Sequence, residues 1–190
     1  MDFPIILFIT LVAAAWVISW VAATQLFRKN QPTSFADPNE RINPDPIPFL
    51  VYGTLRPGGG NYENFFGDVR ILDIREVTVP GLKMYALGVG YPYCVADENY
   101  TITGTLITVD PDDHLRALEG TDWLEGFRNV GNRNNHYDRK VITFQDGKQT
   151  IQAWVYLASE KSQISIQRQN LPVVENGDWL EWEITAELTR

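Results

Sequence analysis

Residues 49–60 read Phe49-Leu50-Val51-Tyr52-Gly53-Thr54-Leu55-Arg56-Pro57-Gly58-Gly59-Gly60, a short apolar run that passes into a glycine-rich turn. Aromatic and β-branched residues prevail from Phe49 to Tyr52, which is typical of a buried strand. Gly53 allows backbone conformations that a side chain would forbid, so the chain can turn directly after the strand. The N–H groups of Gly53, Thr54 and Leu55 can then point into one concavity, and such a row holds a carboxylate or a phosphate.

This stretch resembles a known family motif. Residues Tyr52 to Gly58 resemble the opening motif of the γ-glutamylcyclotransferase-like superfamily, in its AIG2-like branch. Later segments are similar to further family motifs in the same order: Leu118-Glu119-Gly120, then Tyr137-Asp138-Arg139, then Ala153 to Tyr156. The resemblance therefore spans residues 49–156. Taken alone, the glycines would indicate only a junction between a strand and a loop.

The resemblance implies an intramolecular reaction on a γ-glutamyl amine. The α-amino group of this small-molecule substrate attacks its own γ-carbonyl, which yields 5-oxoproline and a free amine. The substrate supplies the nucleophile, so neither a catalytic serine or cysteine nor a cofactor is expected. Glu119 matches the catalytic position of the family, where a carboxylate accepts a proton from the substrate ammonium and passes one to the departing nitrogen.

The resemblance also implies which residues bind the substrate. The main-chain amides of Gly53–Leu55, beside Tyr52, would hold the α-carboxylate. Tyr137 would line the same pocket or donate a hydrogen bond in it, and Tyr156 is a weaker candidate for the lining. Arg139 is expected to pair with a nearby acid.

Alternatives to catalysis exist for the same residues. Glu119 could be a surface residue near the end of a helix. A non-catalytic module that binds a carboxylate or a peptide end near a membrane would keep the loop, because a fold does not imply an activity. A transferase acting on γ-glutamylated intermediates is a further possibility. The connection Thr121–His136 is longer than in compact family members, so the leaving amine stays open.

Composition excludes several other classes of function. The chain has 190 residues and a formal net charge of −8, which argues against nucleic acid as a partner because such binding needs a basic face. A single cysteine, Cys94, excludes an intramolecular disulfide framework. Two histidines give no metal-ligand cluster, so no metal site is predicted.

The amino-terminal segment predicts a membrane anchor. Phe3 to Phe27 contains no charged residue and is long enough to cross a bilayer as a helix. Because Arg28 and Lys29 follow it, we expect the amino terminus outside and the globular domain in the cytoplasm. A cleaved signal peptide fits less well, since no positive charge precedes the apolar run. A helix buried in a partner protein is a third interpretation.

The chain is thus expected to contain three parts: an anchor over residues 1–29, a proline-rich linker over residues 30–46 and a γ-glutamylcyclotransferase-like domain over residues 47–190. Prolines in the linker favour an extended tether without regular structure. The many predicted strands, tight turns and short helices indicate an α+β domain. The resemblance implies a small, closed or nearly closed, mixed β-barrel with short peripheral helices.

The helix that carries Glu119 has clear start signals. Asp110 is suited to the N-cap position and Pro111 to the first helical position. Gly120 is expected to end this helix, which would place Glu119 at its carboxyl end. Further along, Asp146-Gly147 predicts a hairpin between strands at Lys140–Phe144 and Thr150–Leu157.

Overall fold

The computed structural model describes residues 33–36, 46–88 and 90–188. The predicted anchor, Phe3–Phe27, lies outside this range, so the membrane helix and the cytoplasmic location of the domain stay predictions. Within the described residues, no helix has both the length and the apolar character needed to cross a membrane.

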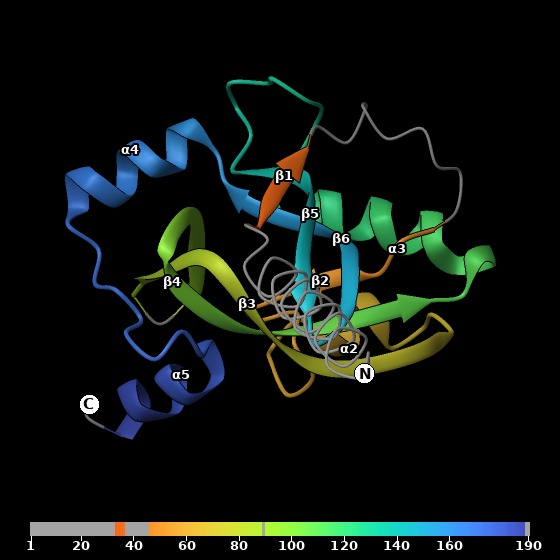
Figure 1. The fold of residues 1–190 in the computed structure, drawn as a ribbon. Coiled ribbons are helices and arrows are strands. Elements are labelled where there is room, and N and C mark those ends of the chain that lie inside the picture. The colour runs from red at the N-terminus through yellow and green to blue at the C-terminus, as the bar shows by residue number, and fades with distance from the viewer. Residues whose placement is uncertain (1–32, 37–45, 89, 189–190) are drawn as a thin grey trace, which may run out of the picture.

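A curled six-stranded sheet forms the centre of the described domain, and short helices lie around it (Figure 1). The strands are β1 (Ser34–Ala36), β2 (Phe49–Val51), β3 (Ile71–Leu87), β4 (Tyr91–Val109), β5 (Tyr137–Asp146) and β6 (Gln149–Ala158). Their order is β1-β5-β6-β2-β4-β3; β2 and β6 are parallel, and the other neighbours are antiparallel. The expected α+β class with a mixed sheet is therefore confirmed.

The expected closure of the sheet is not found. A barrel closes only when every strand has a partner on both sides. Among the described strands, β1 pairs only with β5, and β3 pairs only with β4. The sheet is therefore an open, curled half-barrel. Strand β1 is itself unexpected, because Ser34–Ala36 lies in the segment predicted to be an extended linker.

Strand β2 is the central element, as its apolar run predicts. All three of its residues are buried, and successive side chains enter different parts of the core. Leu50 packs in one hydrophobic cluster, whereas Phe49 and Val51 pack in another beneath helices α2 (Tyr62–Phe66) and α3 (Pro111–Leu124). Because alternate residues of a strand point to opposite faces, β2 separates two halves of the core.

Helix α3 begins as predicted and ends later than predicted. The Asp110 carboxylate accepts a hydrogen bond from the Asp112 main-chain N–H at 3.0 Å, which caps the helix. Gly120 lies inside the helix, and the chain leaves it only after Leu124, where Gly126 has a φ of +63°. A positive φ favours glycine and is typical of helix ends.

Strands β3 and β4 form a long antiparallel ribbon. Residues 71–87 form one strand, with a bulge between Pro80 and Leu82. Asp97-Glu98-Asn99 lies within β4 opposite that bulge. The predicted hairpin at Asp146-Gly147 is confirmed between β5 and β6.

The carboxyl-terminal segment packs on the β3–β4 ribbon. It contains α4 (Glu160–Gln169) and α5 (Trp179–Leu188), and α5 lies at the lower left of Figure 1. Between these helices, Val174 donates its N–H to the Met84 carbonyl at 2.9 Å, and Thr103 donates to the Gly177 carbonyl at 2.9 Å. Trp179 is fully buried, so this segment belongs to the core.

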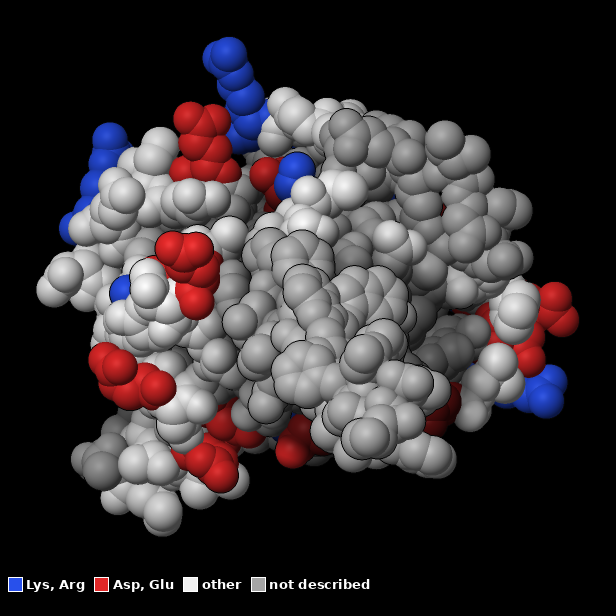
Figure 2. Space-filling view, in the orientation of Figure 1, with Lys and Arg blue, Asp and Glu red and all other residues white. Residues whose placement is uncertain are grey.

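The surface charge follows the acidic composition. In Figure 2, acidic side chains lie at several places around the described surface, and basic side chains lie singly near its edges. The described part of this face shows no continuous basic patch.

Candidate functional site

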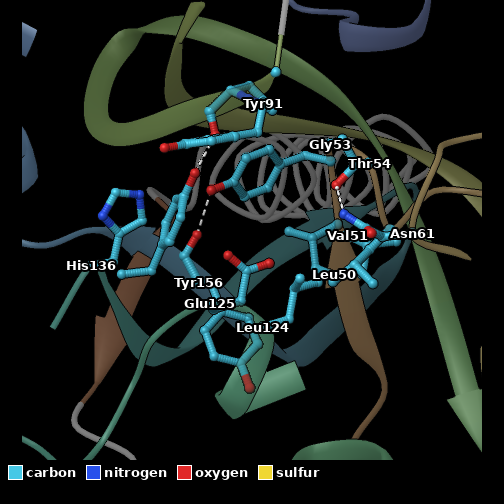
Figure 3. Close-up of a pocket in the computed structure, with 15 residues that line it drawn as sticks. Leu50, Val51, Gly53, Thr54, Asn61, Tyr91, Leu124, Glu125, His136 and Tyr156 are labelled. Atoms are coloured by element: carbon cyan, nitrogen blue, oxygen red, sulfur yellow. Dashed lines mark hydrogen bonds between the residues drawn. The ribbon is translucent and has the colours of Figure 1, made fainter. Parts of the chain in front are cut away.

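A cavity of about 240 Å³ opens where the end of β2, the start of β4 and the end of α3 meet (Figure 3). Its lining is Leu50, Val51, Tyr52, Gly53, Thr54, Leu55, Asn61, Gly90, Tyr91, Pro92, Leu124, Glu125, His136, Tyr137 and Tyr156. The structure thus brings together five of the predicted site residues, namely Tyr52, Gly53, Thr54, Leu55 and Tyr137. It does not bring Glu119 there.

The glycine turn forms one wall of the cavity. A Cβ atom on Gly53 would lie 2.8 Å from Cγ of Pro92, so only glycine fits between β2 and β4 at this position. The main-chain N–H of Arg56 donates a hydrogen bond to the Gly53 carbonyl at 3.0 Å, which closes the turn. Asn61 supports the loop through a 2.9 Å hydrogen bond from its side-chain amide to Thr54 Oγ1.

The donors of this turn are available to a ligand. No hydrogen bond found within the described part of the chain uses the N–H groups of Gly53, Thr54 or Leu55. The three groups follow one another at the end of a rigid strand. Consecutive main-chain N–H groups of this kind make an anion-binding concavity.

Two buried tyrosines hold the walls of the cavity together. Tyr52 donates its hydroxyl to the Tyr156 carbonyl at 2.5 Å, and Tyr137 donates its hydroxyl to the Pro92 carbonyl at 2.8 Å. Burial raises the pKa of both phenols well above the ordinary value, so both stay neutral. In this structure the two hydroxyl groups link neighbouring segments of the chain through these hydrogen bonds.

Glu125 supplies the carboxyl group of the cavity. Figure 3 shows its carboxyl group pointing into the space enclosed by the lining residues, with Gly53 and Thr54 on the other side of that space. No hydrogen bond to this carboxyl group is found within the described part of the chain. Burial raises its pKa from the ordinary value of 4.5 to about 8. The group can therefore both accept and donate a proton near neutral pH.

The predicted position of the acid was Glu119, which is exposed and does not line the cavity. Successive residues of an α-helix are rotated by about 100°. Ala117 and Thr121 are the buried residues of α3, and they share one face because they lie four positions apart. Glu119 lies midway between them in sequence and therefore on the opposite face. It points to solvent because α3 continues past Gly120.

One sequence signal could have identified Glu125. The tripeptide Leu118-Glu119-Gly120 occurs a second time as Leu124-Glu125-Gly126. Only the second copy lies at the end of the helix, where its glycine has a positive φ. The predicted long connection also shortens, because residues 121–124 belong to α3.

Side chains of β5 and β6 hold the end of α3. The Tyr156 hydroxyl donates to Asp122 Oδ1 at 2.7 Å and lies 2.9 Å from Thr121 Oγ1. Arg139 pairs with Asp122 at 2.5 Å, so its predicted pairing with a nearby acid is confirmed. Tyr137 also donates its main-chain N–H to the Glu125 carbonyl at 3.1 Å. These contacts fix the position of Glu125, beside which the cavity opens.

His136 lies at the aromatic side of the cavity. Its Nε2 atom is 2.9 Å from the Tyr93 hydroxyl, and its ring packs edge to face against Tyr91 and Tyr137. Burial, with the nearby Lys161 charge as a smaller cause, lowers its pKa. The imidazole is therefore neutral at neutral pH.

Cys94 is not among the residues that line the cavity. Cys94 is fully buried, and burial raises its thiol pKa well above the ordinary value. The described residues contain no group of three or more histidine, cysteine, aspartate or glutamate side chains placed to hold a metal ion. What converges on the cavity is a row of N–H donors and one acid.

Comparison with known proteins gives a family match. Residues 49–181 match the model of the family described as gamma-glutamyl cyclotransferase, AIG2-like. The solution structure of an Arabidopsis thaliana protein is similar to this chain with a TM-score of 0.45 and 22% sequence identity, over 75% of this chain and 84% of that one. No curated protein matches the chain.

The raised pKa of Glu125 predicts how stability depends on pH. Between about pH 4.5 and about pH 8, the folded protein keeps a proton that the unfolded chain has lost. The free energy of unfolding should therefore fall across this range as pH rises, and the fall should be weaker in Glu125→Gln. Urea unfolding of both proteins at several pH values measures the difference. Glu119→Gln is the matched control and should keep the dependence, whereas equal slopes for Glu125→Gln and the parent would contradict the assignment.

Proposed function

Because the chain belongs to the gamma-glutamyl cyclotransferase, AIG2-like family, we propose that it converts a γ-glutamyl amine to 5-oxoproline and a free amine. The observation that carries this proposal is the position of the Glu125 carboxyl group across one cavity from Gly53 and Thr54, in a lining that also includes Leu55. A γ-glutamyl group carries an α-carboxylate that the N–H groups can bind and an α-amine that can give a proton to Glu125.

The N–H row orients the substrate. The α-carboxylate accepts hydrogen bonds from the N–H groups of Gly53, Thr54 and Leu55, which places the α-amine toward Glu125. The neighbouring walls from Tyr52 and Tyr137 limit how the glutamyl chain can extend. Folding the chain toward its cyclic form before reaction removes entropy that would otherwise be lost at the barrier, an effect worth several kcal/mol in favourable cases.

Glu125 moves the proton. As a carboxylate it accepts one proton from the substrate ammonium, and its raised pKa of about 8 makes it a stronger base than an ordinary carboxylate. The free amine then attacks the γ-carbonyl carbon and forms the new C–N bond of the lactam. As the old C–N bond breaks, the ring nitrogen gives its second proton to the departing nitrogen and Glu125 gives up the first one, so the amine leaves as an ammonium ion and Glu125 returns to its starting state.

Replacing the acid tests this proposal. Glu125→Gln keeps the size of the side chain but cannot transfer the proton, so release of 5-oxoproline should fall by about 10²–10⁴-fold. Glu119→Gln, on the exposed face of the same helix, should release 5-oxoproline at the parental rate. Chromatographic measurement of 5-oxoproline with several γ-glutamyl amines provides the readout.

The two variants also separate the competing interpretations. Loss of activity in Glu119→Gln but not in Glu125→Gln would overturn the assignment of the acid. If the parent protein binds γ-glutamyl compounds and releases no 5-oxoproline from any of them, the non-catalytic carboxylate-binding or peptide-binding module replaces the enzyme.

The charges around the cavity indicate which leaving amines fit. Among the described lining residues there is no lysine or arginine, and Glu125 is the acidic one. A leaving amine with its own carboxylate would therefore find no cation. We expect kcat/KM to be at least about tenfold higher for γ-glutamyl-phenethylamine than for γ-glutamyl-phenylalanine, which differs by one carboxylate; tenfold corresponds to about 1.4 kcal/mol. Equal values, or the reverse order, would contradict this preference.

The apolar segment Phe3–Phe27, followed by Arg28 and Lys29, supports the further proposal that the domain is anchored to a membrane and faces the cytoplasm. The full-length protein should then remain in membranes washed at high pH, and a protease added to sealed cells should not reach the domain. A mature protein whose mass lacks the apolar segment would instead identify a cleaved signal peptide.

A further inference from the structure

Arg56 immediately follows the N–H row, yet its side chain leaves the cavity. The residue is 4% exposed and does not line the cavity. Its guanidinium group donates to Asp178 Oδ1 at 2.8 Å, to Glu76 at 2.9 Å and to Thr105 Oγ1 at 3.3 Å. The buried Arg56 guanidinium group therefore holds the turn on the side that faces away from the cavity.

Asp178 is the less exposed acid in this cluster. Its side chain is 14% exposed, whereas that of Glu76 is 69% exposed. An exposed ion pair contributes little because water and salt screen it, but removing one partner of a buried pair leaves an uncompensated charge. The Arg56–Asp178 pair therefore carries most of the constraint on the Arg56 side chain.

Asp178 is itself held rigidly by the carboxyl-terminal segment. Its Oδ1 atom accepts hydrogen bonds from the N–H groups of Leu180 at 3.0 Å and Glu181 at 3.3 Å, at the start of α5. The residue before it, Gly177, is bonded to β4, and the residue after it, Trp179, is fully buried. Asp178 is thereby placed by contacts on both sides in the sequence.

These contacts connect the carboxyl terminus to the substrate loop. We propose that Asp178, acting through Arg56, is a positioning residue that sets the direction of the N–H groups of Gly53–Leu55 and so determines how firmly the substrate's α-carboxylate is held. The inference rests on the proposed function, because it assigns that carboxylate to the turn. It gives a role to the Gly177-Asp178-Trp179 segment, which does not line the cavity.

The test is Asp178→Asn in the full chain. Asparagine is as good an N-cap as aspartate, so α5 keeps its start while the charge opposite Arg56 is lost. Two substrates separate positioning from general damage: a γ-glutamyl amide, and the 4-aminobutanoyl amide of the same amine. The second lacks only the α-carboxylate and cyclises in the same way, to 2-pyrrolidinone and the free amine.

The variant should lower kcat/KM for the γ-glutamyl amide by about tenfold or more, mainly through a higher KM. For the 4-aminobutanoyl amide, kcat/KM should change by less than about twofold, because that substrate makes no use of the N–H row. Glu76→Gln is the matched control and should leave both values near the parental ones. A loss of equal size for both substrates would show that Asp178 only supports the fold and would overturn the inference.

Binding of the two products gives a second measurement that does not depend on turnover. Calorimetry should show about tenfold weaker binding of 5-oxoproline to Asp178→Asn than to the parent, and unchanged binding of 2-pyrrolidinone. Equal changes for the two lactams would again overturn the inference. Failure of the proposed function would be seen separately, as a parent protein that releases no 5-oxoproline.

Discussion

The close packing of Gly53 against Pro92 is the constraint on which the site depends. Strand β2 is buried on both faces, so its end cannot move away from β4 without opening the core. A side chain at position 53 would need the space that the Pro92 ring fills. The hydroxyl of Tyr137 holds the Pro92 carbonyl in turn. The turn is therefore rigid before any ligand arrives, and preorganised donors need little rearrangement to hold an anion.

The electrostatics of the cavity follow from where α3 ends. Glu125 lies at the carboxyl end of this helix, where the helix dipole disfavours negative charge. Burial disfavours the carboxylate as well and raises its pKa to about 8. Arg139 of β5 and Tyr156 of β6 bond to Asp122 and so hold the end of α3 against the sheet. Burying Glu125 lowers the stability of the folded protein, and this residue can exchange a proton near neutral pH.

Glu119 was expected at the carboxyl end of α3, but the helix continues to Leu124 and Glu119 lies on its exposed face. The start of α3 was predicted because a cap acts within one turn: Asp110 bonds the N–H of a residue two positions away. The end of α3 was not predicted, because glycine can also lie inside a helix when tertiary packing outweighs its low helix propensity. Gly120 does so here, since Ala117 and Thr121 on either side of it are buried against the sheet. The tripeptide Leu-Glu-Gly occurs twice, and only the packing of α3 determines which copy lies at the end of the helix.

The sequence by itself determined the elements whose causes are local. These are the buried strand β2 and its glycine turn, the capped start of α3, and the hairpin at Asp146-Gly147. The tertiary structure alone decided that the sheet stays open, that Glu125 faces the cavity, and that Arg56 pairs with Asp178. Each of these results depends on groups that lie far apart in the chain or on different faces of one helix. Short-range propensity contains no information about such distances, because they are set by how the whole core packs.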